Sequence, residues 1–147
     1  MKIYKFDKQL KIGNKGENSF IKFYHKLNPR KSSENKVDII INDNDKVEIK
    51  TDTTASKNFF MERYGDIEKK KDGGPWRSKN DDIPIFVYFF INEKIFYWFD
   101  SNTLCDYLNK NLKKFQKRSI FNYGYASLGY LIPRIEIEHL AVRIDKF

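Results

Sequence analysis

The segment VDIIINDNDKVEIKTD, residues 37–52, holds two short apolar runs separated by a polar stretch. The NDND stretch between the runs is typical of a hairpin turn. Side chains of a strand alternate between its two faces, so the charged residues of the second run share one face and its apolar residues share the other. The charged face holds Lys46, Glu48, Lys50 and Asp52, and the apolar face holds Val47, Ile49 and Thr51.

The register of this hairpin follows from matching its faces. If Asp38 lies opposite Glu48, then Ile39 lies opposite Val47 and residues 42–44 form the loop. Apolar residues then meet on one face and carboxylates meet on the other, whereas a shift of one residue would scramble both faces. A three-residue loop with an Asn in the left-handed conformation is also a common hairpin connection. We therefore predict the register that sets Asp38 beside Glu48.

Two directly opposed carboxylates repel each other, so a positive charge must offset the repulsion. Lys50 lies on the same face as Glu48 and supplies one such charge. Mg²⁺ prefers oxygen ligands and is often held by one or two carboxylates together with water and phosphate. The hairpin thus favours a metal site, and the alternative is a solvated, charged sheet face without a ligand.

The rest of the chain predicts one α/β (α+β) domain over residues 1–147, a mixed sheet flanked by helices. Helical periodicity marks residues 16–27, and Ser101 is suited to cap a helix that runs to residue 117. The apolar run at 83–90 is typical of a strand in the centre of a sheet. The remaining segments are a strand at 94–100, a strand or short helix at 56–65, a polar loop at 66–82, and a late strand or two within 130–145.

Composition sets limits on the class of protein. The chain has 147 residues, of which 40% are hydrophobic, as expected for a single globular domain. Lys and Arg number 28 against 20 Asp and Glu, and the resulting net charge of +8 favours a polyanionic partner. No apolar run reaches the length of about 18 residues that spans a membrane, so we expect no membrane partner. The lone Cys105 is expected to be a small core residue, as in a cytoplasmic protein.

Asp38, followed by Glu48-Ile49-Lys50 on the next strand and preceded by a helix that carries Glu17, resembles the PD-(D/E)XK nuclease superfamily. The resemblance implies a restriction-endonuclease-like core. It implies that Asp38, Glu48 and the backbone carbonyl of Ile49 bind Mg²⁺, for which Mn²⁺ substitutes. It further implies that Lys50 orients or activates the attacking water and that Glu17 completes the catalytic set.

The resemblance extends over most of residues 12–133. The motifs EIKTD, NFFMER, GGPW and DDIPIFVYFF, in that order, are similar to a phage and bacterial subgroup of these nucleases. Asn58, Glu62 and Gly74 fall at positions that match the subgroup. One departure is Val37, which stands where a proline would precede the acidic residue.

A tryptophan among basic residues is a further candidate for DNA contact. Trp76 lies in a Gly-Pro segment beside Arg77 and Lys79. Such a side chain can stack on a base or wedge into a duplex, and the alternative is a Trp folded back onto the core. Together with Asn58 and Glu62, these three residues form the predicted DNA-contacting set.

The resemblance implies a Mg²⁺-dependent endodeoxyribonuclease in which an activated water attacks a phosphodiester bond. We expect DNA as partner, no small-molecule cofactor, and a homodimer, because many such enzymes dimerise to cut both strands. The expected location is the cytoplasm of a bacterium or of a phage host. Small, basic, single-domain members of this superfamily often resolve Holliday junctions, so the resemblance favours a Holliday-junction resolvase. The alternatives are a duplex-cutting restriction- or phage-type endonuclease and a non-catalytic DNA-binding protein that keeps the fold.

Overall fold

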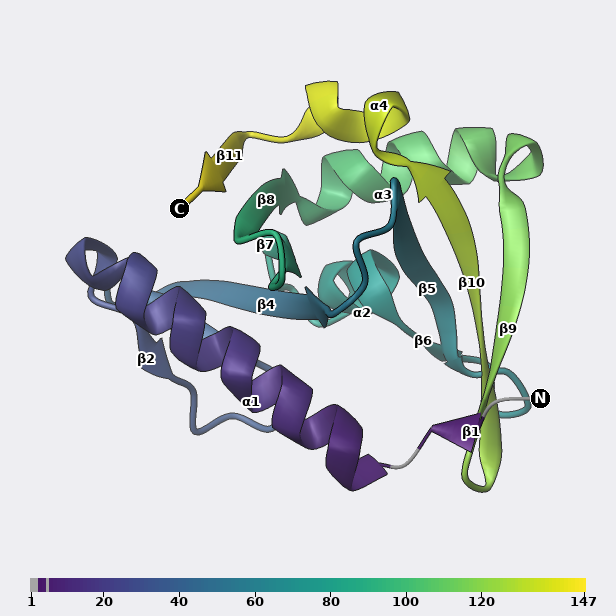
Figure 1. Cartoon of the computed structure of the whole chain (residues 1–147), viewed down its shortest axis with the longest axis horizontal. Helices are drawn as coiled ribbons and strands as arrows, with labels where there is room; N and C mark the ends of the chain where they lie inside the picture. The colour runs from purple at the N-terminus through teal and green to yellow at the C-terminus, as the bar shows by residue number, and fades with distance from the viewer. Residues whose placement is uncertain (1–2, 5) are drawn as a thin grey trace.

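The computed structural model describes residues 3–4 and 6–147, with side chains from residue 7 onward. Its strands form a six-stranded and a five-stranded sheet, with helices packed around them (Figure 1). The predicted α/β class with a mixed sheet flanked by helices is therefore confirmed, although the strands divide into two sheets. In the described part of the chain, every helix is too short or too polar to cross a membrane.

The first sheet is built on the predicted hairpin. Its strands, in order across the sheet, are β11 (Arg143–Lys146), β8 (Ile95–Asp100), β7 (Ile85–Phe90), β4 (Asp45–Asp52), β3 (Ile39–Ile41) and β2 (Arg30–Lys31). β4 and β7 pair in parallel, and the other neighbours pair antiparallel. Every residue of β7 after Ile85 is buried, which agrees with the central position predicted from its apolar run.

The second sheet contains strands that the sequence specified less clearly. Its order is β1 (Ile3–Tyr4), β9 (Gln116–Asn122), β10 (Tyr125–Pro133), β5 (Asn58–Asp66) and β6 (Lys71–Asp72). The segment 56–65, for which both a strand and a short helix were open, forms β5. The late segment 130–145 contributes the end of β10 and most of β11, with a short helix between them.

The hairpin of β3 and β4 has the predicted register. Ile39 pairs with Val47 and Ile41 pairs with Asp45, so residues 42–44 form the loop. Asn42 and Asp43 have φ angles of 46° and 75°, a left-handed conformation that Asn and Asp tolerate better than most residues. Asp38 directly precedes β3, on the side of the hairpin where β4 carries Glu48.

Helix α1 (Phe6–Phe23) covers the apolar face of the hairpin, and it begins well before the predicted start at residue 16. Gly13 and Gly16 both lie inside this helix. Gly16 allows α1 to pack closely on β4, because a Cβ added there would lie 1.7 Å from Oγ1 of Thr51. Phe20 joins residues of β3, β4 and β7 in one buried cluster.

The polar loop predicted at 66–82 is wrong, because the segment contains β6 and helix α2 (Gly74–Asn80). Pro75 lies in the first turn of α2, where a missing N–H leaves no hydrogen bond unmade. Gly74 has a φ of +48°, and a Cβ there would lie 2.8 Å from the carbonyl oxygen of Glu62. Two glycines therefore deliver the chain from β6 directly into a helix that packs against β5.

Helix α3 (Ser101–Asn111) ends before the predicted residue 117. Its N-cap is Asp100, whose carboxylate accepts a hydrogen bond from the N–H of Thr103, while the hydroxyl of Ser101 donates to the carbonyl of Ile83. The predicted cap at Ser101 is thus displaced by one residue. Cys105 is buried, as expected. The remaining helices are α4 (Arg134–Ile137) and the 3₁₀ turns η1 (His25–Leu27), η2 (Leu112–Lys114) and η3 (Glu138–Leu140).

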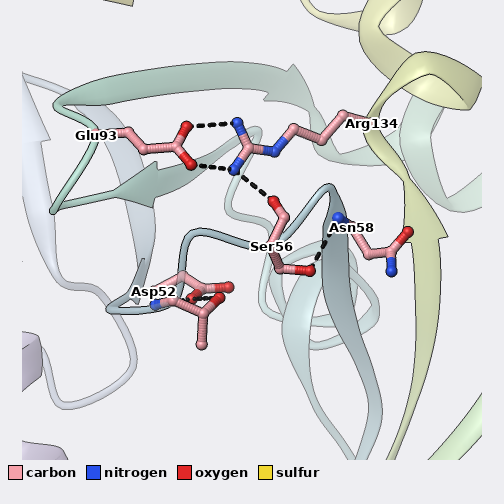
Figure 2. Close-up of polar contacts among 6 residues, drawn as sticks. Asp52, Ser56, Asn58, Glu93 and Arg134 are labelled. Carbon is pink, nitrogen blue, oxygen red and sulfur yellow. Dashed lines mark hydrogen bonds and ion pairs between the residues drawn. The ribbon is translucent and has the colours of Figure 1, made fainter.

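Arg134 joins the two sheets (Figure 2). Its guanidinium donates to both carboxylate oxygens of Glu93, at 2.8 and 3.0 Å, and to the carbonyl of Ser56 at 2.6 Å. It also lies 3.5 Å from the ring centroid of Phe90. Arg134 follows β10, and Glu93 lies in the turn between β7 and β8, so this clamp fixes the second sheet against the first.

Candidate functional site

Asp38 lies at the open edge of β4. Its Oδ2 accepts a hydrogen bond from the N–H of Ile49 at 2.9 Å. The N–H and C=O of one strand residue point to the same edge, so the carbonyl of Ile49 is directed to that edge as well. Burial raises the pKa of Asp38, against the opposing effects of this hydrogen bond and of the charge of Arg77. Two of the predicted metal ligands are thereby brought together.

Glu48 is held between the first sheet and α2. It is 9% exposed and accepts a hydrogen bond from the hydroxyl of Ser78. Nε of Arg77 lies 3.8 Å from its Oε1. The pKa of Glu48 is raised to about 7: burial and the negative charges of Asp38 and Asp81 raise it, while the Ser78 hydrogen bond and the charge of Arg77 lower it. The carboxylates of Asp38 and Glu48 are therefore electrostatically coupled.

Lys50 follows Glu48 on the same face of β4 and faces the second sheet. Its ammonium acts to lower the pKa of Glu62 on β5, whose burial has the larger, opposite effect. Arg77 also lowers the pKa of Glu62. Glu62 therefore shares the cation Arg77 with the acidic cluster formed by Asp38 and Glu48, and its contact with DNA stays a prediction.

Glu17 approaches this cluster from α1. Burial raises its pKa, the charge of Asp38 raises it further, and Lys31 lowers it. Asp38 therefore interacts with Glu17 on one side and with Glu48 on the other. The neighbouring Gly16 fixes the height of α1 above β4 and with it the position of Glu17.

The donors fit a hard divalent cation. Among residues that the structure describes, no three His, Cys, Asp or Glu side chains form a ligand group by themselves. The predicted set has two carboxylates, Asp38 and Glu48, and the Ile49 carbonyl, and Mg²⁺ commonly completes such a set with water and phosphate oxygens. Burial without full charge compensation makes these carboxylates gain from a bound cation.

Three predicted DNA-contacting residues lie outside the cluster. Trp76 is 5% exposed, packs in the core and donates its indole N–H to Asn109 at 2.8 Å, so the prediction that it contacts DNA is wrong. Asn58 lines a separate hollow beside Phe115. Lys79 is exposed and lies 3.6 Å from Asp106.

Sequence reasoning missed two polar residues that hold acidic side chains of β4. Ser78 is fully buried and donates to Glu48, but nothing in its apparently loop-like surroundings marked it. Tyr88 donates to Asp52 at 2.5 Å and accepts from the N–H of Phe60 at 3.0 Å. The alternation of β7 was masked by its continuous apolar character, so the inward hydroxyl of Tyr88 gave no signal.

The raised pKa of Glu48 predicts a dependence of stability on pH. The folded state holds the Glu48 proton up to a pKa of about 7, against 4.5 for the ordinary value, so metal-free protein should lose stability as pH rises between these values. This difference between the two pKa values lowers the free energy of unfolding by about 3 kcal/mol above pH 7, compared with its value at low pH. Urea unfolding in EDTA at pH 5.0 and 7.5 measures the effect.

The matched variants isolate the contribution of Glu48. Glu48→Gln should be more stable than wild type at pH 7.5 and should lose most of the difference between the two pH values. Glu68→Gln, at an exposed glutamate, should leave both unfolding curves unchanged. Equal pH dependence in wild type and Glu48→Gln would contradict the buried, raised carboxylate.

Comparisons of this chain with protein-family models, with curated proteins and with solved structures find no match. A functional assignment therefore depends on the geometry of the cluster and on the motifs that the sequence carries.

Proposed function

We propose that this protein is a divalent-metal-dependent DNA endonuclease of the PD-(D/E)XK type, with Asp38, Glu48 and the carbonyl of Ile49 as the ligands of Mg²⁺ or Mn²⁺. The observation that carries the proposal is the placement of two carboxylates at β4, the buried Glu48 on the strand and the partly buried Asp38 hydrogen-bonded to its edge, with Lys50 on the same face as Glu48. Strongly perturbed carboxylates in such a cluster are typical of functional sites.

Each side chain of the cluster has a distinct role in the proposed reaction. A bound Mg²⁺ supplies activation of water and neutralisation of charge on the phosphate. Lys50 orients the attacking water and stabilises the charge that develops on the phosphate oxygens. Arg77 balances the carboxylates in the metal-free protein, and its half-exposed guanidinium is suited to contact a phosphate. Glu17, whose pKa is raised by the charge of Asp38, would complete the set of acidic groups around the metal.

The rival explanation, a solvated charged face, conflicts with the burial of the cluster. A solvated carboxylate keeps its water, whereas Glu48 is covered by α2 and hydrogen-bonded to Ser78. Burying an ionised carboxylate destabilises the folded state unless a cation or hydrogen bonds offset the loss of water. A chain that only needed a solvated hairpin would not place Glu48 under a helix.

We further propose DNA as the substrate, because the net charge of +8 favours a polyanion. Branched DNA is the leading class, with a Holliday junction as the specific proposal and duplex as the alternative. A homodimer would place two such sites on opposite strands. A non-catalytic DNA-binding protein is the second candidate, and the proximity of Arg77 to Glu48 favours it, since a guanidinium already neutralises part of the cluster.

Incubation with supercoiled plasmid and with a synthetic four-way junction tests the proposal. We expect cleavage in Mg²⁺ or Mn²⁺ and none in EDTA. Cleavage that ignores EDTA would contradict a metal-dependent enzyme. Tight binding of both DNAs without cleavage in either metal would favour the second candidate. Nicked plasmid with an intact junction would reject the resolvase and leave the nuclease in place.

A further inference from the structure

Exposed aromatic side chains gather at one end of the β9–β10 hairpin. Asn122 pairs with Tyr125, so Tyr123 and Gly124 form a two-residue turn in which Gly124 has a φ of +89°. Figure 1 shows this turn at the end of the hairpin that lies away from α3 and α4. Tyr123 is 83% exposed, Phe121 is 44% exposed and Tyr125 is 43% exposed.

The aromatic side chains occupy both faces of the hairpin and its tip. Phe121 shares one face of β9 with Lys117, because residues four apart on a strand point the same way. Tyr125 pairs with a residue of the opposite face and therefore shares that face with Arg118. Tyr123 lies in the turn itself. The hairpin end is thus a wedge with aromatic rings on either side and cations behind them.

The surroundings of this tip are basic. Lys117 and Arg118 are exposed on β9. The turn between β5 and β6 lies beside the hairpin, since the N–H of Ile67 donates to the carbonyl of Ala126 at 2.8 Å. This turn carries exposed lysines at 69–71, with Glu68 as an exposed acid. Exposed aromatic rings among cations form a surface for nucleic acid, because rings stack on bases and cations hold phosphates.

We propose that the β9–β10 tip, defined by Phe121, Tyr123 and Tyr125, stacks on base faces that are exposed at a branch in DNA, with Lys117 and Arg118 on the flanking phosphates. This inference rests on the proposed function and narrows its substrate to DNA whose base stacking is interrupted. An intact duplex shows only the edges of its bases, and stacking would require the tip to unstack them first. A branch offers base faces without that cost, so the tip favours branched DNA over duplex.

The charge of the tip favours DNA over a second copy of the chain as its binding partner. Two copies of the tip would bring the same lysines and arginine together, and like charges across an interface oppose association. DNA phosphates instead complement all of these cations. An anionic membrane surface shares the negative charge but offers no planar rings for the aromatic side chains to stack on.

Binding in EDTA tests the tip without cleavage. The probes are a four-way junction with 2-aminopurine at the branch and a duplex of the same length. We expect wild type to bind the junction about tenfold more tightly than the duplex and to quench 2-aminopurine fluorescence by stacking. Tyr123→Ala should lose about tenfold in junction affinity and the quenching, with duplex affinity unchanged. Tyr123→Phe should keep both, since it retains the ring.

Ile135→Ala is the matched control, because Ile135 is 81% exposed on α4, which lies at the opposite end of the hairpin from the tip (Figure 1). It should change neither affinity. Junction affinity and quenching that survive Tyr123→Ala, or an equal loss on junction and duplex, would overturn the assignment. It would also be overturned if Tyr123→Ala altered only self-association in sedimentation, or only binding to anionic phospholipid vesicles. Because binding is measured without metal, a protein that fails to cleave DNA can still show the predicted stacking by the tip. If the protein cleaves DNA but Tyr123→Ala binds the junction as wild type does, only the role of the tip is rejected.

Discussion

Lys50→Ala is expected to reduce Mg²⁺-dependent cleavage of supercoiled plasmid by at least about 100-fold, because a positioned group that assists the attacking water contributes at least that much. The variant removes the ammonium and leaves Asp38 and Glu48 in place, so metal affinity should persist. Initial rates at saturating DNA measure the loss, and thermal unfolding verifies the fold.

Lys46→Ala is the matched control for this prediction. Lys46 lies on the same strand and in the same charged set as Lys50, but it lies near the loop and pairs with Glu34 at 3.5 Å. Its removal should change the cleavage rate by less than about threefold, the size expected for an exposed pair. Full activity of Lys50→Ala, or an equal loss in both variants, would contradict the role given to Lys50.

The second large effect is expected at Gly16, where α1 rests on β4. Gly16→Ala should lower the free energy of unfolding by about 2–3 kcal/mol, as forced overpacking of a close contact does. The added Cβ would lie 1.7 Å from Oγ1 and 2.8 Å from Cβ of Thr51, so α1 must shift. The shift would move Glu17, and cleavage should fall with stability. Urea unfolding and plasmid cleavage measure the two losses.

Gly13→Ala on the same helix provides the opposite expectation. A Cβ at Gly13 meets nothing within 4 Å, so the variant should gain about 0.5–1 kcal/mol from helix propensity alone. The double variant Gly16→Ala with Thr51→Ala should recover part of the loss, because the closest atom is gone. If Gly16→Ala proved as stable as Gly13→Ala, the close packing of α1 on β4 would be wrong.

The hairpin could be predicted from the sequence because its two faces have different chemistry. Only one register places Ile39 against Val47 and leaves residues 42–44 as a loop, and the structure has that register. The central burial of β7 also followed from its apolar run. Where the two sides of a strand differ in polarity, the sequence pattern alone predicts its register and which side is buried.

Helix α2 could not be predicted, because its sequence shows no such difference in polarity between two faces. It has seven residues, too few for a helical period to emerge, and it begins with Gly-Pro, a pair that usually marks a loop. Missing α2 also hid the contact of Ser78 with Glu48 and the burial of Trp76. The extent of α1 was missed because Gly16 indicates a break locally, whereas the tertiary contact with Thr51 requires a residue without Cβ.

Titration of Mn²⁺ into the metal-free protein at pH 7.5, followed by calorimetry, tests the central claim most directly. The claim is that Asp38 and Glu48 share one cation beside Lys50. Wild type should bind Mn²⁺, Lys50→Ala should bind it with similar affinity, and the double variant Asp38→Asn with Glu48→Gln should bind at least about 100-fold more weakly, since both charged ligands are lost. Equal affinity in wild type and the double variant, or no binding to wild type, would contradict it.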